Sequence, residues 1–303
     1  MLRPYRRALS APARPSRLGA QTTFRAMLIA PQVETLGASS SRRQSALLVR
    51  IERALTVQEL LDLASQSVGL AELAWHRRLR DFPDAAPLVA RRLSASESLF
   101  AESDPGLVQE HLIAALFWCG AQGAAHLSAC FDHLGPYAQS QACVALGLLH
   151  HRPAADRIWN CHHTLAADPR YCLGPLWGLI DLSDPRATPA LTNLLLQKRA
   201  FAELYGMLAR KGGAACVVPL LDRIVRLPKA RRRDPLLALA AIAQRIGREA
   251  LLAEFARVSS TPDEATATRL LTLPAPTILA HFAWYDWEIA VGPASLTTTP
   301  GSG

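Results

Sequence analysis

The chain has 303 residues, which is enough for two compact domains or one elongated array. Half of the residues are apolar but only 6% are aromatic, so Ala, Leu, Val and Ile must fill the interior, a mixture that favours helices and argues against an extensive sheet. The net charge of +8 belongs to residues 1–50, which hold nine Arg and one acid, whereas the rest holds 24 basic and 24 acidic residues. This neutral body argues against nucleic-acid binding, which needs clustered cations to neutralise phosphates.

Residues 1–45 are predicted to form a disordered basic tail. Residues 1–26 contain six Arg, three Pro and no acid, and they lack the apolar block of a secretory signal. The same composition is typical of an organelle transit peptide, so two locations stay open: the cytoplasm, or an organelle if residues 1–26 are a transit peptide. Residues 37–45 are rich in Ser and indicate a flexible linker.

An N-terminal helical cap is expected over residues 46–100. Apolar residues recur at helical spacing in two segments that follow one another from residue 46, and Thr56 is a suitable N-cap for the second of these helices. Two further helices are expected at residues 70–80 and 86–99.

Residues 101–258 read as five helix pairs of nearly equal length. In the first pair an apolar stripe follows Asp104-Pro105, and Gly120 and Gly123 are expected to end that helix before a second stripe begins. Each pair has one apolar anchor in its second helix, and successive anchors are 31, 33, 29 and 32 residues apart. These anchors are Leu127, Ile158, Leu191, Leu220 and Leu252. Because a single helix pair cannot bury its apolar face, this period predicts an α-solenoid in which each pair covers the next.

The first pair also resembles a known family. Asp104-Pro105-Gly106-Leu107-Val108, followed by Ala114-Ala115-Leu116, is similar to the Asp-Pro-x-x-Val-Arg…Ala-x-x-Ala-Leu-Gly pattern of HEAT-like repeats of the phycobilisome-lyase type. Ala145-Leu146-Gly147 repeats part of this pattern, whereas Gln109 stands where the family usually has Arg. The resemblance implies an all-α fold, namely an α-solenoid of HEAT-like helical pairs with N- and C-terminal helical caps. It also implies an alternative function, that of an accessory protein or lyase acting on a modified protein.

Residues 259–303 are expected to provide the C-terminal cap and a disordered end. Pro262 would open the cap helix, with acidic residues in its favourable first turn. The most aromatic window of the chain follows at residues 281–287. Because Trp and Tyr dominate interface hot spots, this window supplies the candidate partner-binding residues Trp284, Tyr285 and Trp287. The alternative is that these rings pack over the last repeat.

Two groups of His and Cys residues invite a metal-binding interpretation. His126, Cys130 and His133 can share one helix face, but Cys130 also lies on the apolar stripe, which favours a core position. The second group comprises His150-His151, Cys161-His162-His163 and Cys172. The sequence lacks the His-Glu dipeptides of the helical-repeat deoxyhypusine hydroxylases, so that activity is not carried over. The six Cys form no CxxC pair, which indicates buried thiols in a reducing compartment, and no metal or cofactor is predicted.

The remaining motifs are few. Lys229-Ala230-Arg231-Arg232-Arg233 could bind a phosphate or an acidic partner, although such a run is more often a solvated loop. The sequence has no Gly-rich phosphate loop, Gly-x-Ser-x-Gly or His-Glu-x-x-His motif, so no catalytic residue is predicted, and no apolar run reaches the roughly 18–20 residues of a membrane span. We therefore expect a non-catalytic scaffold that binds another protein through the concave surface of the solenoid, without a membrane partner. The lesser alternatives are the lyase-like function and a nucleic-acid-binding helical-repeat protein.

Overall fold

The computed structural model describes residues 42–63, 70–95, 105–166, 171–197, 202–258 and 264–282, and every regular element within these ranges is helical. The predicted all-α fold is therefore confirmed for this part of the chain. The α-helices are α3 (Arg42–Arg53), α4 (Val57–Leu63), α5 (Leu70–Leu79), α6 (Ala85–Ser94), α8 (Pro105–Trp118), α9 (Gly120–Cys130), α10 (Pro136–Leu148), α11 (Ala155–Leu165), α12 (Leu173–Asp181), α13 (Ala187–Leu196), α14 (Ala202–Lys211), α15 (Val217–Arg226), α16 (Arg233–Ile246), α17 (Arg248–Phe255), α18 (Glu264–Leu271) and α19 (Ala275–Phe282). Short 3-10 helices are η2 (Phe131–His133), η3 (Arg152–Ala154), η4 (Ala214–Cys216) and η5 (Lys229–Arg231). None of these helices has both the length and the apolarity that crossing a bilayer requires.

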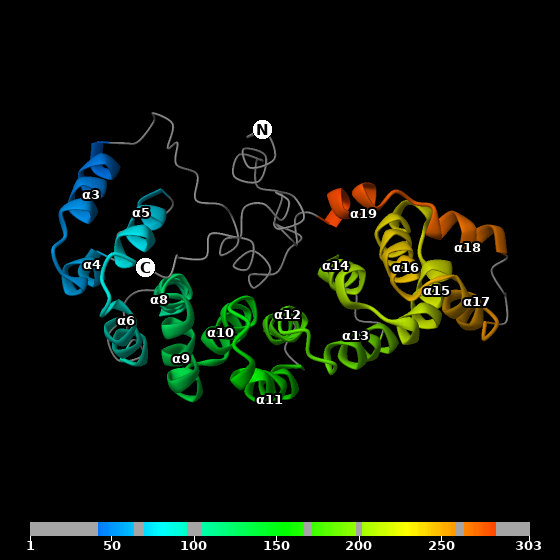
Figure 1. Cartoon of the computed structure of the whole chain (residues 1–303), viewed down its shortest axis with the longest axis horizontal. Coiled ribbons are helices and arrows are strands. Elements are labelled where there is room, and N and C mark those ends of the chain that lie inside the picture. The colour runs from blue at the N-terminus through cyan, green and yellow to red at the C-terminus, as the bar shows by residue number, and fades with distance from the viewer. Residues whose placement is uncertain are drawn as a thin grey trace, which may run out of the picture.

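The helices follow one another along an open arc from α3 to α17 (Figure 1). The inner layer of this arc consists of α8, α10, α12, α14 and α16, and the outer layer of α9, α11, α13, α15 and α17. Each inner helix contacts the next inner helix in chain order, most broadly between α10 and α12 and between α14 and α16. The apolar core lies between neighbouring helices and runs on along the arc as one cluster.

The inner helices end in similar ways. A residue with positive φ follows α8, α10, α12 and α16, at Gly120, His150, Ser183 and Gly247. After His150, the backbone N–H of His151 donates to the carbonyl of Leu146 at 3.0 Å. After Ser183, the backbone N–H of Asp184 donates to the carbonyl of Leu179 at 2.9 Å. These bonds satisfy carbonyls at the helix end and turn the chain sharply towards the outer helix. The sequence has a helix-breaking pattern at each of these positions: a glycine at 120 and at 247, His150-His151-Arg152-Pro153, and Ser183-Asp184-Pro185.

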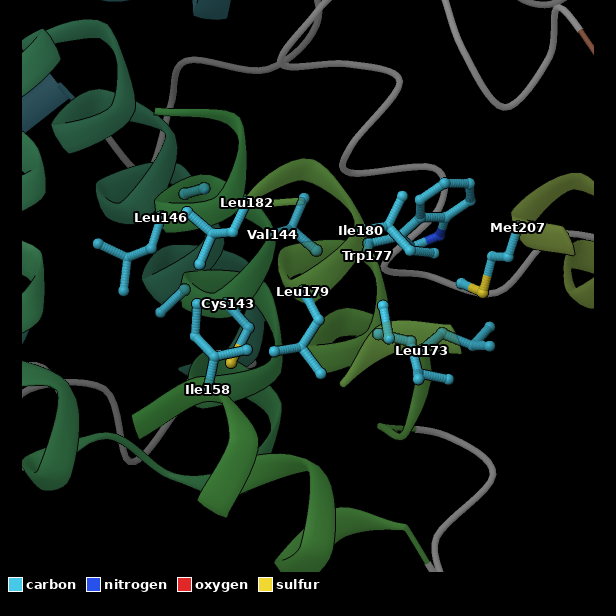
Figure 2. Packing of buried hydrophobic residues seen from close by; sticks show 14 of the residues in the cluster. Cys143, Val144, Leu146, Ile158, Leu173, Trp177, Leu179, Ile180, Leu182 and Met207 are labelled. Carbon is cyan, nitrogen blue, oxygen red and sulfur yellow. The ribbon is translucent and has the colours of Figure 1, made fainter. Parts of the chain in front are cut away.

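The interface between α10 and α12 depends on small residues. A Cβ on Gly147 would lie 2.6 Å from the Cα of Gly178, and a Cβ on Gly178 would lie 2.5 Å from the carbonyl oxygen of Cys143. A Cβ on Gly174 would lie 2.2 Å from the carbonyl oxygen of Ser140. Any side chain at these positions would push the two helices apart. Figure 2 shows the apolar side chains that surround this contact, with Cys143 among them.

Three details differ from the sequence prediction. α3 begins at Arg42, inside the expected tail, which is consistent with the high helix propensity of Arg. Gly123 does not end a helix but lies within α9, where a Cβ would be 1.8 Å from the carbonyl oxygen of Leu116. Glycine is needed there because α8 and α9 approach closely. In the last pair, Leu251 is fully buried, whereas the expected anchor Leu252 is only partly buried.

The helix α4 begins directly after its predicted N-cap residue, Thr56. The backbone N–H of Glu59 donates to Thr56 Oγ1 at 3.2 Å, and the Glu59 carboxylate accepts the N–H of Leu55 at 2.7 Å. The first bond is that of an N-cap side chain, so the assignment of Thr56 as an N-cap is confirmed, and the second resembles a capping box but reaches the residue before the N-cap. The indole of Trp75 donates to the carbonyl of Leu60 at 2.6 Å and ties α5 to α4.

The C-terminal helices α18 and α19 pack against α16. The side-chain amide of Gln244 donates to the carbonyl of Leu273 at 2.7 Å, and His281 Nε2 lies 2.8 Å from Asp234 Oδ1. These contacts hold the last described helices on the final pair. The predicted helix start at Pro262 lies outside the described residues.

Arginine–carboxylate contacts join successive units of the outer layer. Arg157 of α11 reaches back to Asp132 of η2 at 3.2 Å, and Arg186, just before α13, reaches back to Asp156 of α11 at 2.8 Å. Arg186 also binds Asp184 at 2.7 Å. Its hydrogen bonds lower the pKa of Asp184 below the usual range, because they stabilise the charged carboxylate. The contacts of Arg157 and Arg186 thus tie the second and the third helix pair to the pair before.

Replacing Arg186 by Leu is expected to lower the free energy of unfolding by about 1–2 kcal/mol, because Asp184 is only 8% exposed and would lose its guanidinium. Urea unfolding measures this change. The control is Arg226→Leu, whose partner Asp222 is well exposed, and which should cost less than about 0.5 kcal/mol. Equal effects of the two substitutions would show that the Asp184 contact is not stabilising.

Candidate functional site

The residues predicted to bind a partner, Trp284, Tyr285 and Trp287, lie outside the described residues. Their immediate neighbours are described. Phe282 is buried in the apolar core, and His281 pairs with Asp234 as above. The aromatic window therefore begins directly beside α16.

The two His and Cys groups do not converge on one point. Cys130 is buried and its thiol donates to the carbonyl of Leu127 at 3.4 Å, whereas His133 is exposed. In the second group Cys161 and His162 are buried, and the exposed His163 ring packs edge-on against Trp159 at 4.3 Å. Within the part of the chain that the structure describes, no three His, Cys, Asp or Glu side chains are placed to hold a metal ion.

The basic run at residues 229–233 is partly structural. The guanidinium of Arg232 donates to the carbonyl of Leu227 at 2.7 Å and to that of Val225 at 3.0 Å. It thereby satisfies carbonyls at the end of α15, where a cation is also favoured by the helix dipole. Lys229 and Arg231 remain exposed on η5.

The inner layer carries a polar group that we call the tyrosine cluster, formed by Glu110, Tyr137, Gln141 and Tyr171. The hydroxyl of Tyr137 donates to the Glu110 carboxylate and accepts a hydrogen bond from the Gln141 amide at 3.1 Å. The rings of Tyr137 and Tyr171 meet edge to face at 6.2 Å. The cluster therefore spans three successive inner segments: α8, α10 and the turn before α12. Sequence reasoning missed it, although the two tyrosines stand 34 residues apart, close to one repeat period.

A groove, which we call the outer groove, lies between η2, the start of α10, η3 and α11. It has a volume of about 600 Å³. The residues that line it are Phe131, Asp132, Gln139, Pro153, Asp156, Arg157, Asn160, Cys161 and Thr164. Arg157 binds Asp132 of η2 and the side chain and carbonyl of Ser128 in α9. Asp132 and Asp156 have side chains that are 67% and 89% exposed, so both carboxylates face solvent.

Two thiols lie under this groove. Cys161 lines it but is buried, and Cys143 contacts Cys161 from the interior. Burial, together with the neighbouring Cys161, raises the pKa of Cys143 well above the usual range. Cys143 therefore stays a neutral thiol and behaves as a small apolar core residue.

One buried histidine has no visible role in binding. His76 of α5 is 2% exposed, and its ring lies 5.2 Å from that of Trp75 and 6.5 Å from that of Trp118 between centroids. Neither ring nitrogen has a hydrogen-bond partner among the described residues. Burial, with a smaller effect of His111, lowers the pKa of His76 to about 3. The ring is therefore neutral at neutral pH and cannot act there as a cation or a general acid.

The tyrosine cluster and the outer groove have to be interpreted from their own side chains, because comparison with known proteins found no match. No protein-family model, curated protein or solved structure matches this chain. The resemblance to HEAT-like repeats consequently rests on the sequence pattern alone.

Proposed function

We propose that helices α8–α17 form an α-solenoid of HEAT-like pairs and that the chain is a non-catalytic scaffold that holds another protein. The observation that carries this proposal is the serial contact of the inner helices, each with the next in chain order. Side-chain contacts between successive units repeat the same interval: Ser140 binds the carbonyl of Tyr171, 31 residues on, and Arg186 binds Asp156, 30 residues back. A stack of this kind offers one long surface rather than a closed cavity.

The tyrosine cluster is the part of the inner layer best suited to a protein partner. Tyrosine presents a large rigid ring with a polar end, and it is enriched among the residues that dominate binding energy. The described arginines favour the same reading over nucleic acid, because many of them already bind carboxylates, as Arg157 and Arg210 do. Whether Trp284, Tyr285 and Trp287 extend this surface stays a prediction.

A photo-crosslinking amino acid of the benzoylphenylalanine type tests the proposal. It replaces Tyr137 in one variant of the full chain and the exposed Asn193 of the outer helix α13 in the control. After irradiation in the native host, we expect the Tyr137 variant to form a protein adduct of defined mass that the Asn193 variant does not form. Adding Tyr171→Ala to the Tyr137 variant should reduce the adduct strongly, because both rings belong to one cluster.

Three results would overturn the proposal. Equal adducts at Tyr137 and Asn193 would mean that the inner layer has no specific partner. A nuclease-sensitive adduct would favour the nucleic-acid alternative. An adduct that contains only a tetrapyrrole-bearing protein, accompanied by a change in its absorption spectrum, would favour the lyase-like alternative.

A further inference from the structure

We propose that a basic patch between α15 and α16 binds an acidic segment of a partner protein that also carries a large apolar side chain. This inference goes beyond the proposed scaffold function, because it assigns a separate surface and names the charge of its occupant. The surface, which we call the η5 patch, covers the end of α15, η5 and the start of α16. Its members are Arg223, Val225, Lys229, Arg231, Arg232, Arg233 and Leu236.

The η5 patch carries positive charge that the acids beside it do not balance. Residues 222–234 contain six basic residues but only two acidic ones. Both carboxylates are already engaged: Asp222 binds Arg226 at 2.8 Å, and Asp234 lies 2.8 Å from His281. The chain after residue 50 has 24 basic and 24 acidic residues, so this excess of cations is a local feature and not a property of the whole body.

Three cations of the patch are exposed and unpaired. The side chains of Lys229, Arg231 and Arg233 make no hydrogen bond or ion pair with a described residue. Elsewhere in the described part of the chain, arginines such as Arg186 and Arg248 bind a carboxylate. The three unpaired cations can therefore form charge-assisted hydrogen bonds with the carboxylates of a partner.

Two further arginines fix the patch in place and keep their charge. The guanidinium of Arg232 donates to the carbonyl of Leu227 at 2.7 Å and to that of Val225 at 3.0 Å, and Arg223 Nε donates to the hydroxyl of Tyr205 at 2.8 Å. All of these acceptors are uncharged, so neither guanidinium is neutralised. Because the contacts hold the loop to the end of α15, the patch is preformed and loses less conformational entropy when a partner binds.

Exposed apolar side chains in the patch favour a protein segment over a nucleic acid. Val225 is 66% exposed and Leu236 is 39% exposed. Both lie close to Arg232, whose guanidinium binds the carbonyl of Val225 and whose own carbonyl accepts the N–H of Leu236 at 3.0 Å. A protein segment can place carboxylates on the cations and an apolar side chain on Val225 and Leu236. Nucleic-acid phosphates would leave these two side chains uncovered, and the balanced remainder of the body provides few further cations for a long polyanion.

Fluorescence anisotropy with a labelled synthetic peptide tests the inference on the full chain. The probe is a heptapeptide of Glu and Gly with one central Trp, and the comparison peptides replace every Glu by Lys or the Trp by Gly. We expect saturable binding of the acidic peptides only, about threefold tighter with Trp than without it. Binding should weaken when NaCl is raised from about 50 to 500 mM, because the charges of the patch are exposed and screened by salt.

Arg231→Gln and Arg152→Gln are matched variants, because each replaces an exposed arginine of a 3-10 helix, η5 or η3, whose side chain has no partner among the described residues. We expect Arg231→Gln together with Lys229→Gln to weaken binding of the acidic peptide about tenfold, and Arg152→Gln to change it less than about twofold. Val225→Ser should abolish the advantage of the Trp peptide over its Gly counterpart. Circular dichroism at matched temperatures verifies that each variant remains folded.

The inference fails if the acidic peptide does not saturate, or if Arg152→Gln weakens its binding as much as the double substitution in η5. A thymidine oligonucleotide of equal net charge that binds more tightly than the peptide would favour nucleic acid instead. A variant with Asp286→Asn and Glu288→Gln should bind the probe like the unaltered chain, and much tighter binding would mean that the chain's own acids occupy the patch. Because the probe is synthetic and the patch shares no residue with the tyrosine cluster, these outcomes are independent of the crosslinking result at Tyr137.

Discussion

Replacing Gly178 by Ala is expected to lower the free energy of unfolding by about 3 kcal/mol and the melting temperature by roughly 10 °C. The new Cβ would lie 2.5 Å from the carbonyl oxygen of Cys143 and 3.3 Å from the side chain of Ile158. The first neighbour is backbone, so the clash can be relieved only if α10 and α12 separate. The loss of packing outweighs the gain of about 1 kcal/mol that Ala brings to a helix.

The matched control is Gly213→Ala. A Cβ there would meet only the methyl group of Thr188 at 3.3 Å, which a small shift can accommodate. Its melting temperature, measured by circular dichroism, should stay within about 2 °C of the unaltered chain. If Gly178→Ala melted together with this control, the close approach of α10 and α12 would not be essential.

Acidification from pH 7.5 to 4.5 is expected to cost about 2–3 kcal/mol of stability through His76 alone. In the folded chain the pKa of His76 is lowered to about 3 by burial, whereas in the unfolded chain it lies near the ordinary 6.5. The unfolded state therefore binds the proton first as the pH falls, and stability is lost between about pH 6.5 and pH 3. His162, whose pKa is lowered to about 4 mainly by burial, acts in the same direction.

His76→Leu isolates this effect, because the variant has nothing to protonate at the buried position. Urea unfolding at pH 7.5, 5.5 and 4.5 should give a shallower decline for this variant than for the unaltered chain. His133→Gln, at an exposed position, should keep the original slope. Asp184, whose pKa is lowered by its hydrogen bonds with Arg186, loses stability only as the pH falls below the ordinary Asp value of about 4, so it does not interfere between pH 7.5 and 4.5. An unchanged slope for His76→Leu would contradict the assignment.

Local chemistry made much of the helical framework predictable from the sequence. The breaks at Gly120 and Gly247 follow from the freedom of glycine at positive φ, and the break at His150 is marked by the Pro that follows three residues later, at Pro153. Thr56 followed three residues later by Glu59 is an equally local signal, which the structure confirms. Gly123 was the misleading case, because a glycine required for close packing looks the same in sequence as one that ends a helix.

The contacts between units could not be predicted in the same way. Which side chains meet across successive pairs depends on the rotation from one pair to the next, and periodicity alone does not give this angle. The contact between Tyr137 and Glu110, and the position of Asn160 in a groove, could therefore not be predicted from the sequence. Its patterns pointed instead to the basic run at residues 229–233 and to the aromatic window at residues 281–287. In the basic run, Arg232 binds carbonyls at the end of α15.

The order of contacts along the arc has a consequence for how the chain acquires its shape. Every broad helix–helix contact joins helices no more than three places apart in the chain, from α3 with α5 to α16 with α19. Contacts with such short sequence separation close small loops and lose little chain entropy, which favours rapid folding. During synthesis, each newly emerged helix pair can therefore dock on the pair made just before it, and none of the described helices from α3 to α19 has to wait for a distant one.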